Sequence, residues 1–299
     1  MSVISAHIRL TRPANIVTAI ADILAGAAIA GGLYFTAGSG ESVDWIKIGW
    51  LVLSTIGLYG GGVAFNDVFD AGLDKVERPE RPIPSGKASV LSAAVMGSLL
   101  LFAGVLAAWQ VSLHAAGLAF AVAVLALLYD AWGKHQSFVG PVNMGLCRAG
   151  NLLLGMSLVQ DAWREWWFVA IIPLLYVSAI TMVSRGEVHG KNKKALQGGA
   201  AIYSGIILFI FAVAYAHNEQ WWESLPFLVL LAVFIFPPLL KAIKHQEPAL
   251  IGKSVKAAVL ALIIVNATLA AAFAGWLVAL SVLILLPISL QLARAFAVT

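Results

Sequence analysis

The side chains best suited to chemistry lie between residues 66 and 74, in a chain with few charges. This stretch contains Asn66, Asp67, Asp70 and Asp74. On a helix this spacing places all four on one face. Carboxylates crowded on one face repel each other unless cations lie among them, and Mg²⁺ binds carboxylate and carboxamide oxygens together with substrate phosphates. The spacing predicts a metal–diphosphate site, and the alternative is a solvated helix end.

A second group of polar side chains falls inside apolar segments. Asn15 and Asp22 lie two turns apart on one face, and Arg148 and Asn151 lie one turn apart. A charged, unpartnered side chain costs about 2.5–3.5 kcal/mol at the centre of a bilayer, so we expect these residues to have polar partners or a function. Either Asp22 and Arg148 neutralise each other, or the group lines a polar cavity that holds a substrate head group. Asn143 and Asn266 are further candidates.

Composition indicates the elements that must position these residues. The 299 residues are 61% hydrophobic and 11% charged, with a mean hydropathy of +0.90, which is typical of a polytopic helical membrane protein. A span needs roughly 20 apolar residues. We therefore expect an all-α protein with nine to ten transmembrane helices, the last two separated near Gly275. The predicted runs are Asn15–Tyr34, Ile46–Phe65, Val90–Trp109, Leu113–Tyr129, Phe138–Leu158, Trp166–Val183, Ala200–Ala216, Trp222–Leu240, Val255–Ala274 and Trp276–Ala295.

The distribution of positive charge predicts the orientation in the membrane. Sixteen of the 19 Lys and Arg residues fall in loops that lie on one side in this arrangement, whereas Lys47 and Arg164 fall on the other side. Loops rich in Lys and Arg are normally cytoplasmic, so the acidic stretch is expected to face the cytoplasm from the cell (inner) membrane. Topology accounts for the basic pI of about 9.2, and no nucleic-acid partner is predicted.

The chain is expected to form one domain over residues 1–299. Its first apolar run has the length of a full span and no clear cleavage site, so we expect no cleavable signal peptide. The single cysteine, Cys147, excludes a disulfide framework.

Four motifs together resemble the UbiA superfamily of intramembrane prenyltransferases. They are Arg12-Pro13-Ala14-Asn15, the acidic stretch at 66–74, Arg81-Pro82-Ile83-Pro84-Ser85-Gly86, and the pair Tyr129 and Lys134. The resemblance implies helices around a central cavity and an isoprenyl diphosphate bound through Mg²⁺. It implies transfer of the prenyl group to an aromatic or other lipophilic acceptor, with membrane lipid around the protein.

Site residues are carried over from the same resemblance. Asp67 and Asp70 would be the catalytic pair, and Asn66 and Asp74 would join them as metal ligands. The resemblance also implies diphosphate contacts from Lys134 and from Arg78 or Arg81, although these two arginines could instead be positive charges that set the topology. Asn15, Arg148 and Asn151 are expected to bind substrate as part of the polar cavity considered above.

The second acidic loop of the family departs from its pattern in this chain. Glu187 is the only acidic residue of segment 184–192, where Arg185 and Lys191 also lie. Glu187 could supply one metal ligand, or the two bases could meet the diphosphate directly. The variant loop is similar to that of the UbiA-like proteins of the ebo gene cluster. Two alternatives to an enzyme therefore stay open, namely a non-catalytic isoprenoid-binding protein of a larger assembly and a transporter.

Overall fold

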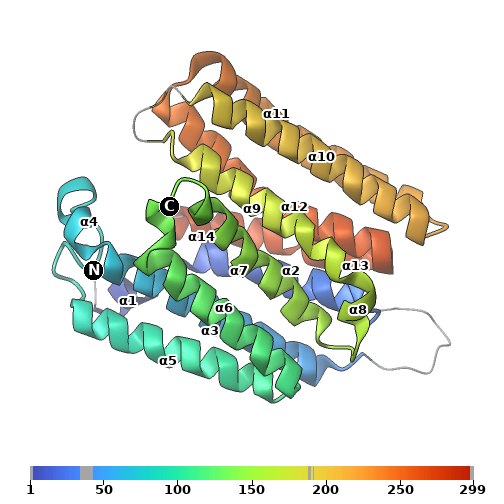
Figure 1. Cartoon of the computed structure of the whole chain (residues 1–299), viewed down its shortest axis with the longest axis horizontal. Coiled ribbons are helices and arrows are strands. Elements are labelled where there is room, and N and C mark those ends of the chain that lie inside the picture. The colour runs from blue at the N-terminus through green and yellow to red at the C-terminus, as the bar shows by residue number, and fades with distance from the viewer. Residues whose placement is uncertain (1–2, 34–42, 188–189, 191, 297–299) are drawn as a thin grey trace.

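In the part of the chain that the computed structural model describes, residues 3–33, 43–187, 190 and 192–296, all regular structure is helical (Figure 1). The helices are α1 (Val3–Leu10), α2 (Pro13–Ile29), α3 (Trp45–Phe69), α4 (Ala71–Glu77), α5 (Val90–Trp109), α6 (Leu113–Ala131), α7 (Val139–Met156), α8 (Ala162–Trp166), α9 (Ile171–Ser184), α10 (Lys193–His217), α11 (Leu225–His245), α12 (Pro248–Ala274), α13 (Trp276–Leu283) and α14 (Leu285–Ala295). Three short 3₁₀ turns connect them: η1 (Gly133–His135), η2 (Trp167–Ala170) and η3 (Trp221–Ser224).

Nine of the ten predicted runs coincide with segments that qualify as membrane spans, and the fifth run, Phe138–Leu158, does not. Among the described residues, eight helical segments are long and apolar enough to cross a bilayer, and the bent pair α1 and α2 makes a ninth. Helix α7 occupies the fifth predicted run but has polar side chains at Asn143, Arg148 and Asn151, which lower its hydropathy. The prediction of an all-α membrane protein is confirmed.

The separation near Gly275 is also confirmed. Helix α12 ends at Ala274, and Gly275 has a φ of +85° and a ψ of 170°, a conformation that is essentially open to glycine alone. The backbone N–H of Trp276 donates to Glu223 Oε2 at 3.0 Å, which fixes the start of α13. Helix α14 then packs along α2, where Ser289 Oγ donates to the Ala14 carbonyl at 2.9 Å.

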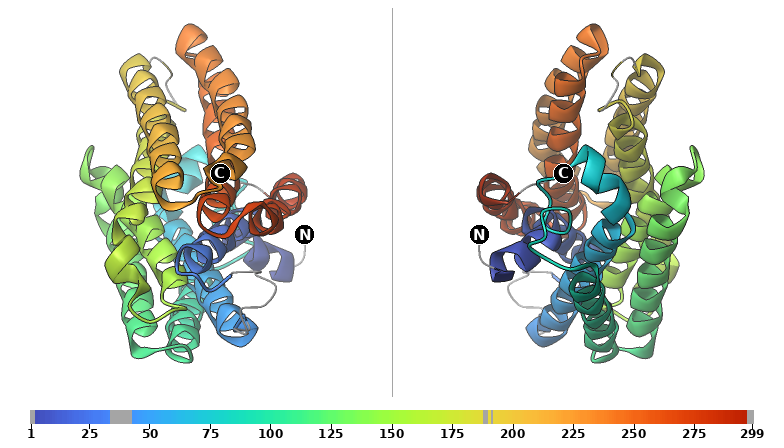
Figure 2. Two further views of the ribbon diagram at one scale, coloured as in Figure 1. Left: turned by 90° about the vertical axis from the view of Figure 1, so that its right-hand side faces the viewer. Right: turned by 90° about the vertical axis from the view of Figure 1, so that its left-hand side faces the viewer.

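Helices α2 and α7 lie between two groups of helices. Helix α2 contacts α3, α7, α12 and α14, and α7 contacts α6 and α9. Figure 2 shows the α10–α12 arm extending away from the group formed by α3, α5 and α6. Residues of α2, α3, α6 and α7 therefore meet inside the molecule, although they come from distant parts of the sequence.

Glycines bring α3 and α5 into close contact. A Cβ on Gly57 would lie 2.5 Å from the Leu100 carbonyl oxygen, and one on Gly61 would lie 2.8 Å from the Gly97 carbonyl oxygen. Small residues at such a seam allow two membrane helices to pack backbone to backbone. The seam fixes the position of α3, whose opposite face lines the cavity described below.

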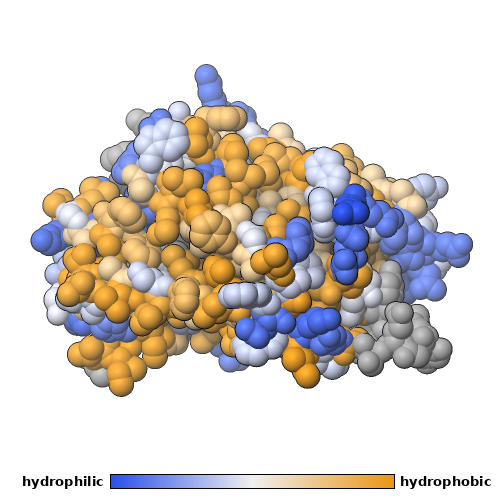
Figure 3. Space-filling view, turned by 60° about the horizontal axis from the view of Figure 1, so that its bottom comes forward, coloured by the Kyte–Doolittle hydropathy of each residue, from blue (hydrophilic) through white to orange (hydrophobic). Residues whose placement is uncertain are grey.

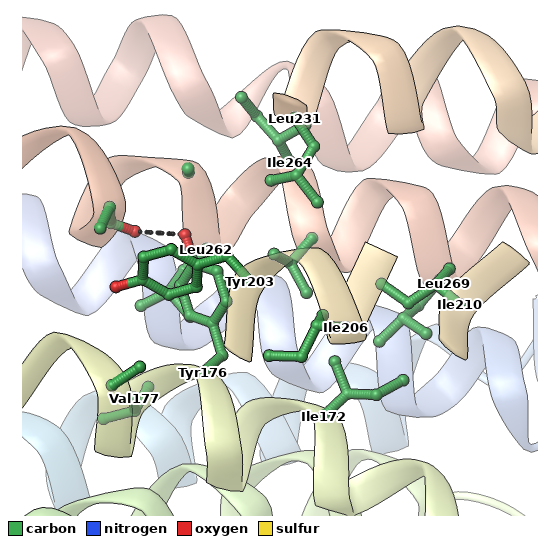
Figure 4. Packing of buried hydrophobic residues seen from close by; sticks show 14 of the residues in the cluster. Ile172, Tyr176, Val177, Tyr203, Ile206, Ile210, Leu231, Leu262, Ile264 and Leu269 are labelled. Carbon is green, nitrogen blue, oxygen red and sulfur yellow. Dashed lines mark hydrogen bonds between the residues drawn. The ribbon is translucent and has the colours of Figure 1, made fainter. Parts of the chain in front are cut away.

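The half of the molecule around α9–α12 is a solid apolar core. Tyr176 and Tyr203 lie with their ring centroids 4.9 Å apart, and the Tyr176 hydroxyl donates to the Ala258 carbonyl at 2.9 Å (Figure 4). Ile172, Ile206 and Ile264 pack in the same buried cluster. This core holds α9, α10 and α12 together.

The outer surface carries large apolar side chains. Leu91, Leu99 and Phe102 of α5 and Phe120 of α6 are all more than half exposed. Figure 3 shows apolar residues covering most of one face, with polar residues concentrated in patches. An exposed apolar surface of this extent suits contact with lipid chains.

Candidate active site

The acidic stretch lies where α3 ends. Asn66 and Asp67 belong to the last turn of α3, Asp70 stands between α3 and α4, and Asp74 belongs to α4. The N–H of Asp70 donates to the Asn66 carbonyl at 3.0 Å, and that of Asp74 donates to the Asp70 carbonyl at 2.8 Å. Helical bonding thus continues across the junction and brings the acidic side chains to one end of the molecule, as the spacing predicts.

Two arginines from distant segments meet these carboxylates. Arg81 Nη1 lies 2.7 Å from Asp74 Oδ2 and 3.3 Å from Asp67 Oδ1, and Arg12 Nη2 lies 3.0 Å from Asp67 Oδ1. Arg12 has a positive φ of 47° at the bend between α1 and α2, a conformation uncommon for residues other than glycine. The bend turns the Arg12 side chain toward the end of α3.

A lysine and a further aspartate complete the group. Lys134 Nζ lies 2.5 Å from Asp70 Oδ1 and 4.0 Å from Asp130 Oδ1. Asn66 Nδ2 donates to Asp130 Oδ1 at 2.7 Å. Asp130 was not among the predicted site residues, although its place one turn before Lys134 was a usable signal. We call this group the mouth cluster: Arg12, Asn66, Asp67, Asp70, Asp74, Arg81, Asp130 and Lys134.

The mouth cluster has the donor atoms for Mg²⁺ but does not form a metal cage. Among the described residues, no three Asp, Glu, His or Cys side chains converge as metal ligands. The carboxylates instead face Arg12, Arg81 and Lys134. Carboxylate and carboxamide oxygens are suitable ligands for Mg²⁺, so the residue types fit the ion. Binding would require some of these ion pairs to break, which would free the carboxylate oxygens.

A cavity of about 210 Å³ adjoins the mouth cluster and lies between α3, α6 and α7. Arg12, Asn66 and Asp130 line one part of it, and most of its remaining wall is apolar. The cavity therefore lies to one side of the apolar core of α9–α12. Its other lining residues are Thr55, Leu58, Tyr59, Gly62, Val63, Val122, Ala126, Tyr129, Met144, Cys147, Arg148 and Asn151.

A buried polar network borders the part of the cavity farthest from the mouth along α3. Asp22 Oδ2 lies 3.0 Å from Arg148 Nη1 and accepts from Asn151 Nδ2 at 3.0 Å, while Oδ1 accepts from Asn266 Nδ2 at 2.7 Å. Thr55 Oγ1 donates to Asn151 Oδ1 at 2.8 Å. We call Thr55, Arg148 and Asn151 the polar floor, because they line the cavity and Asp22 does not.

The structure shows the ion pair of the first reading and places part of the group at a cavity. Asp22 and Arg148 form the expected ion pair, and Arg148 and Asn151 also line the cavity. Asn15 is buried near the start of α2 and is absent from the cavity lining.

The described part of the second loop lies against two other loops at the same end of the molecule. Arg185 Nη2 donates to the Gln136 carbonyl at 2.5 Å, two residues beyond Lys134. Burial raises the pKa of Glu187 above its ordinary value of 4.5, and the positive charge of Arg78 partly offsets this effect. Lys191, the other predicted base of this loop, lies outside the described residues.

Comparison with known proteins identifies relatives of this chain. The UbiA prenyltransferase family model matches residues 24–253. Among curated proteins, digeranylgeranylglyceryl phosphate synthase of Saccharolobus solfataricus is 31% identical over 41% of this chain and 43% of that protein. The protein of the same name from Sulfurisphaera tokodaii is 27% identical over 79% of this chain and 78% of its own length, and that from Ignicoccus hospitalis is 31% identical over 62% and 58%.

Solved structures show the same fold. A UbiA homolog from Archaeoglobus fulgidus bound to GPP and Mg²⁺ superposes with a TM-score of 0.64 at 12% identity, over 88% of this chain and 99% of that one. The apo structure of a UbiA homolog from Aeropyrum pernix K1 gives a TM-score of 0.63 at 15% identity, over 85% and 96%. At these identities the likeness concerns the fold alone.

Proposed function

Because the chain belongs to the UbiA prenyltransferase family, we propose that it is a Mg²⁺-dependent intramembrane prenyltransferase. It would move an isoprenyl group from a diphosphate donor to an aromatic or other lipophilic acceptor. The observation that carries this proposal is the mouth cluster, in which acids and bases alternate beside a largely apolar cavity. The names of the curated relatives and the GPP and Mg²⁺ in a related structure agree with it.

The pairing in the mouth cluster suggests how a diphosphate would be received. Arg12, Arg81 and Lys134 each pair with a carboxylate. A diphosphate brings several negative charges, and guanidinium groups bind phosphate oxygens in a fork. The bases would turn to the phosphates and release carboxylate oxygens.

The released oxygens are those that would hold Mg²⁺. The metal ligands proposed are Asn66, Asp67, Asp70 and Asp74, and the structure adds Asp130 to the same group. When bound, Mg²⁺ would neutralise charge on the leaving diphosphate. Arg81 and Lys134 would stabilise the same charge as the bond from the isoprenyl carbon to oxygen breaks.

The cavity wall would protect the allylic group during transfer. Leu58, Val63 and Met144 line the cavity with apolar side chains. These would exclude water from the electron-poor allylic carbon until the acceptor attacks it. We further propose that the mouth faces the cytoplasm across the cell membrane, as the sixteen basic residues predict.

The second loop is proposed to meet the diphosphate through its bases rather than through a second metal. Glu187 is its only carboxylate, and the hydrogen bond from Arg185 to Gln136 holds that arginine beside the loop of Lys134. Arg185→Ala or Lys191→Ala should then weaken donor binding at saturating Mg²⁺ more than Glu187→Gln does. If Glu187→Gln instead raises the Mg²⁺ requirement, the loop holds a metal.

The test of the proposed function uses the full chain in lipid nanodiscs. Geranyl to geranylgeranyl diphosphates are supplied with Mg²⁺ and a panel of lipophilic phenols and alcohols, and products are identified by mass spectrometry. Asp67→Asn with Asp70→Asn should weaken donor binding by about tenfold or more, since both carboxylates lose their charge. Asp161→Asn is the matched control, because Asp161 pairs with Arg164 3.2 Å away on an exposed surface outside the mouth cluster.

Two results would oppose the proposal. Unchanged donor affinity in the double variant or in excess EDTA would remove the acidic stretch from the mechanism. Tight, Mg²⁺-dependent donor binding without transfer to any acceptor would favour the non-catalytic isoprenoid-binding protein, which the single carboxylate of the second loop also permits.

A further inference from the structure

The polar floor presents an unused hydrogen-bond donor to the cavity. Arg148 is only 5% exposed and lines the cavity. Its Nη1 lies 3.0 Å from Asp22 Oδ2 in the ion pair but makes no hydrogen bond of good geometry within the described part of the chain, so at least one of its two N–H groups has no acceptor there. Its Nη2 is held by Thr18 Oγ1 at 2.7 Å. A buried N–H without an acceptor is costly, and an isoprenyl chain has no oxygen to offer it. This donor therefore calls for a ligand with an oxygen atom.

The charge around the donor is already balanced. Asp22 is fully buried, and its oxygens accept from Asn266 and Asn151 and also lie beside Arg148. These contacts pair the Asp22 carboxylate with the Arg148 guanidinium. Asp22 and Arg148 together carry no net charge, so an anionic ligand would leave an uncompensated negative charge in a low-dielectric interior.

We propose that the polar floor binds an uncharged oxygen of the acceptor, such as a carbonyl, hydroxyl or ether, through Arg148 Nη1. The acceptor class is then a neutral molecule rather than a carboxylate or phosphate. This inference rests on the proposed function for the word acceptor, but the binding chemistry of the floor can be measured without turnover.

The geometry of α3 gives this site a place in the reaction. The Arg148 guanidinium lies 5.7 Å from the Tyr59 ring centroid, and Tyr59 lines the cavity. Tyr59 and Asn66 are two turns apart on α3, which corresponds to about 10 Å along the helix. A molecule anchored at the floor can therefore extend toward the diphosphate at the mouth.

A native reporter of occupancy lies beside the site. Cys147 is the only cysteine of the chain and lines the same cavity next to Arg148. In the full chain in nanodiscs, its rate of modification by methyl methanethiosulfonate can be followed by intact mass. Benzamide, benzoate and ethylbenzene serve as probes of similar size with a neutral oxygen, a carboxylate and no oxygen. We expect benzamide to protect Cys147 at roughly tenfold lower concentration than either of the others.

Two variants change the floor in a defined way. Asp22→Asn leaves Arg148 with a net positive charge. The concentration of benzoate that protects Cys147 should then fall roughly tenfold, to below the concentration of benzamide that is needed. In Asp22→Asn with Arg148→Met, charge and donor are both removed, and benzamide should lose its advantage over ethylbenzene. Thr268→Val is the control, because Thr268 is a buried polar residue of α12 that lies outside the cavity lining, and within the described chain its hydroxyl donates to the Ile264 carbonyl of its own helix.

Specific outcomes overturn the inference. Benzoate protecting the unmodified protein as well as benzamide does would show that the floor accepts anions, and this comparison needs no variant. A benzamide preference that persists in the double variant would show that Arg148 is not the donor. Asp67→Asn with Asp70→Asn should leave benzamide protection unchanged, so failure of donor binding and failure of the floor are separate results.

Discussion

At the scale of the residue, the acids and bases of the mouth cluster pair with each other. Asp67 and Asp74 share Arg81, and Asp70 is held by Lys134. These side chains are 6–20% exposed, so they interact more strongly than ion pairs at a solvated surface. Each base therefore has a structural role in addition to the binding role proposed for it.

Arg81→Ala tests whether Arg81 has these two roles or is only one of the positive charges that set the orientation in the membrane. The substitution leaves two largely buried carboxylates short of a partner, and we expect the free energy of unfolding to fall by about 2 kcal/mol. Affinity for geranyl diphosphate should fall about tenfold. Denaturation in detergent and equilibrium binding would measure the two effects. Lys75→Ala, at an exposed position of α4, is the control, and an equal loss there would contradict the assignment.

Glu187 gives a prediction about pH. Burial raises the pKa of Glu187, so the folded carboxyl holds its proton more tightly than the unfolded one does. Its favourable contribution is complete below its ordinary pKa of 4.5 and is lost as the pH rises through the folded pKa. Glu187→Gln, which keeps an uncharged side chain, should raise the Tm at pH 7.5 and leave it unchanged near pH 4.

A carboxyl group whose pKa is shifted in the opposite direction serves as the control for that experiment. Asp44 caps α3, and the hydrogen bond from the Lys47 backbone N–H lowers the pKa of Asp44. Asp44→Asn should therefore lower the Tm slightly at neutral pH and have no effect well below pH 3.8, the ordinary pKa of the group. If both variants shifted the Tm in the same direction at neutral pH, burial of Glu187 would not be the cause.

At the scale of the element, α3 carries two separate tasks on two faces. Gly57 and Gly61 face α5, whereas Tyr59, Gly62 and Asn66 line the cavity. A shift of α3 at the glycine seam would therefore also move the cavity wall and the mouth cluster.

Gly57→Ala tests this coupling. The new Cβ would lie 2.5 Å from the Leu100 carbonyl oxygen and 2.9 Å from the Gly104 nitrogen, so the two helices must move apart. We expect a loss of about 1–3 kcal/mol in stability and weaker donor binding. Gly49→Ala on the same helix meets no atom within 4 Å and should be neutral or slightly stabilising. If the two variants changed the Tm equally, the change would come from helix propensity rather than from the contact between α3 and α5.

At the scale of the whole molecule, the loops rich in basic residues gather at one end. Gly190 approaches the Gln246 carbonyl and Pro248, so the loop after α9 lies against the turn between α11 and α12. The bond from Arg185 to Gln136 joins the same loop to the connection after α6. Figure 1 shows α4 at this end, while α8 and α13 lie at the other.

Labelling from either side of the membrane would test the orientation. In a Cys147→Ala background, Lys193→Cys and Lys253→Cys should react with an impermeant maleimide only in inside-out vesicles. Glu219→Cys, which is exposed at the opposite end of α10, should react only in right-side-out vesicles. Reaction of Lys193→Cys from outside alone would reverse the orientation and place the mouth on the outer side.

The sequence by itself determined most of the spans, the separation at Gly275, the acidic stretch and the gathering of the basic loops at one end of the molecule. These features are local, because span length follows from bilayer thickness and a positive φ from a single glycine. Only the tertiary structure decided that the acids meet Arg12, Arg81 and Lys134, that Asp130 joins them, and that the cavity lies between α3, α6 and α7. Hydropathy predicts which segments lie in lipid but not which side chains pair with each other. Asp22 and Arg148, for example, are 126 residues apart in the sequence, and only the packing of their helices brings them together.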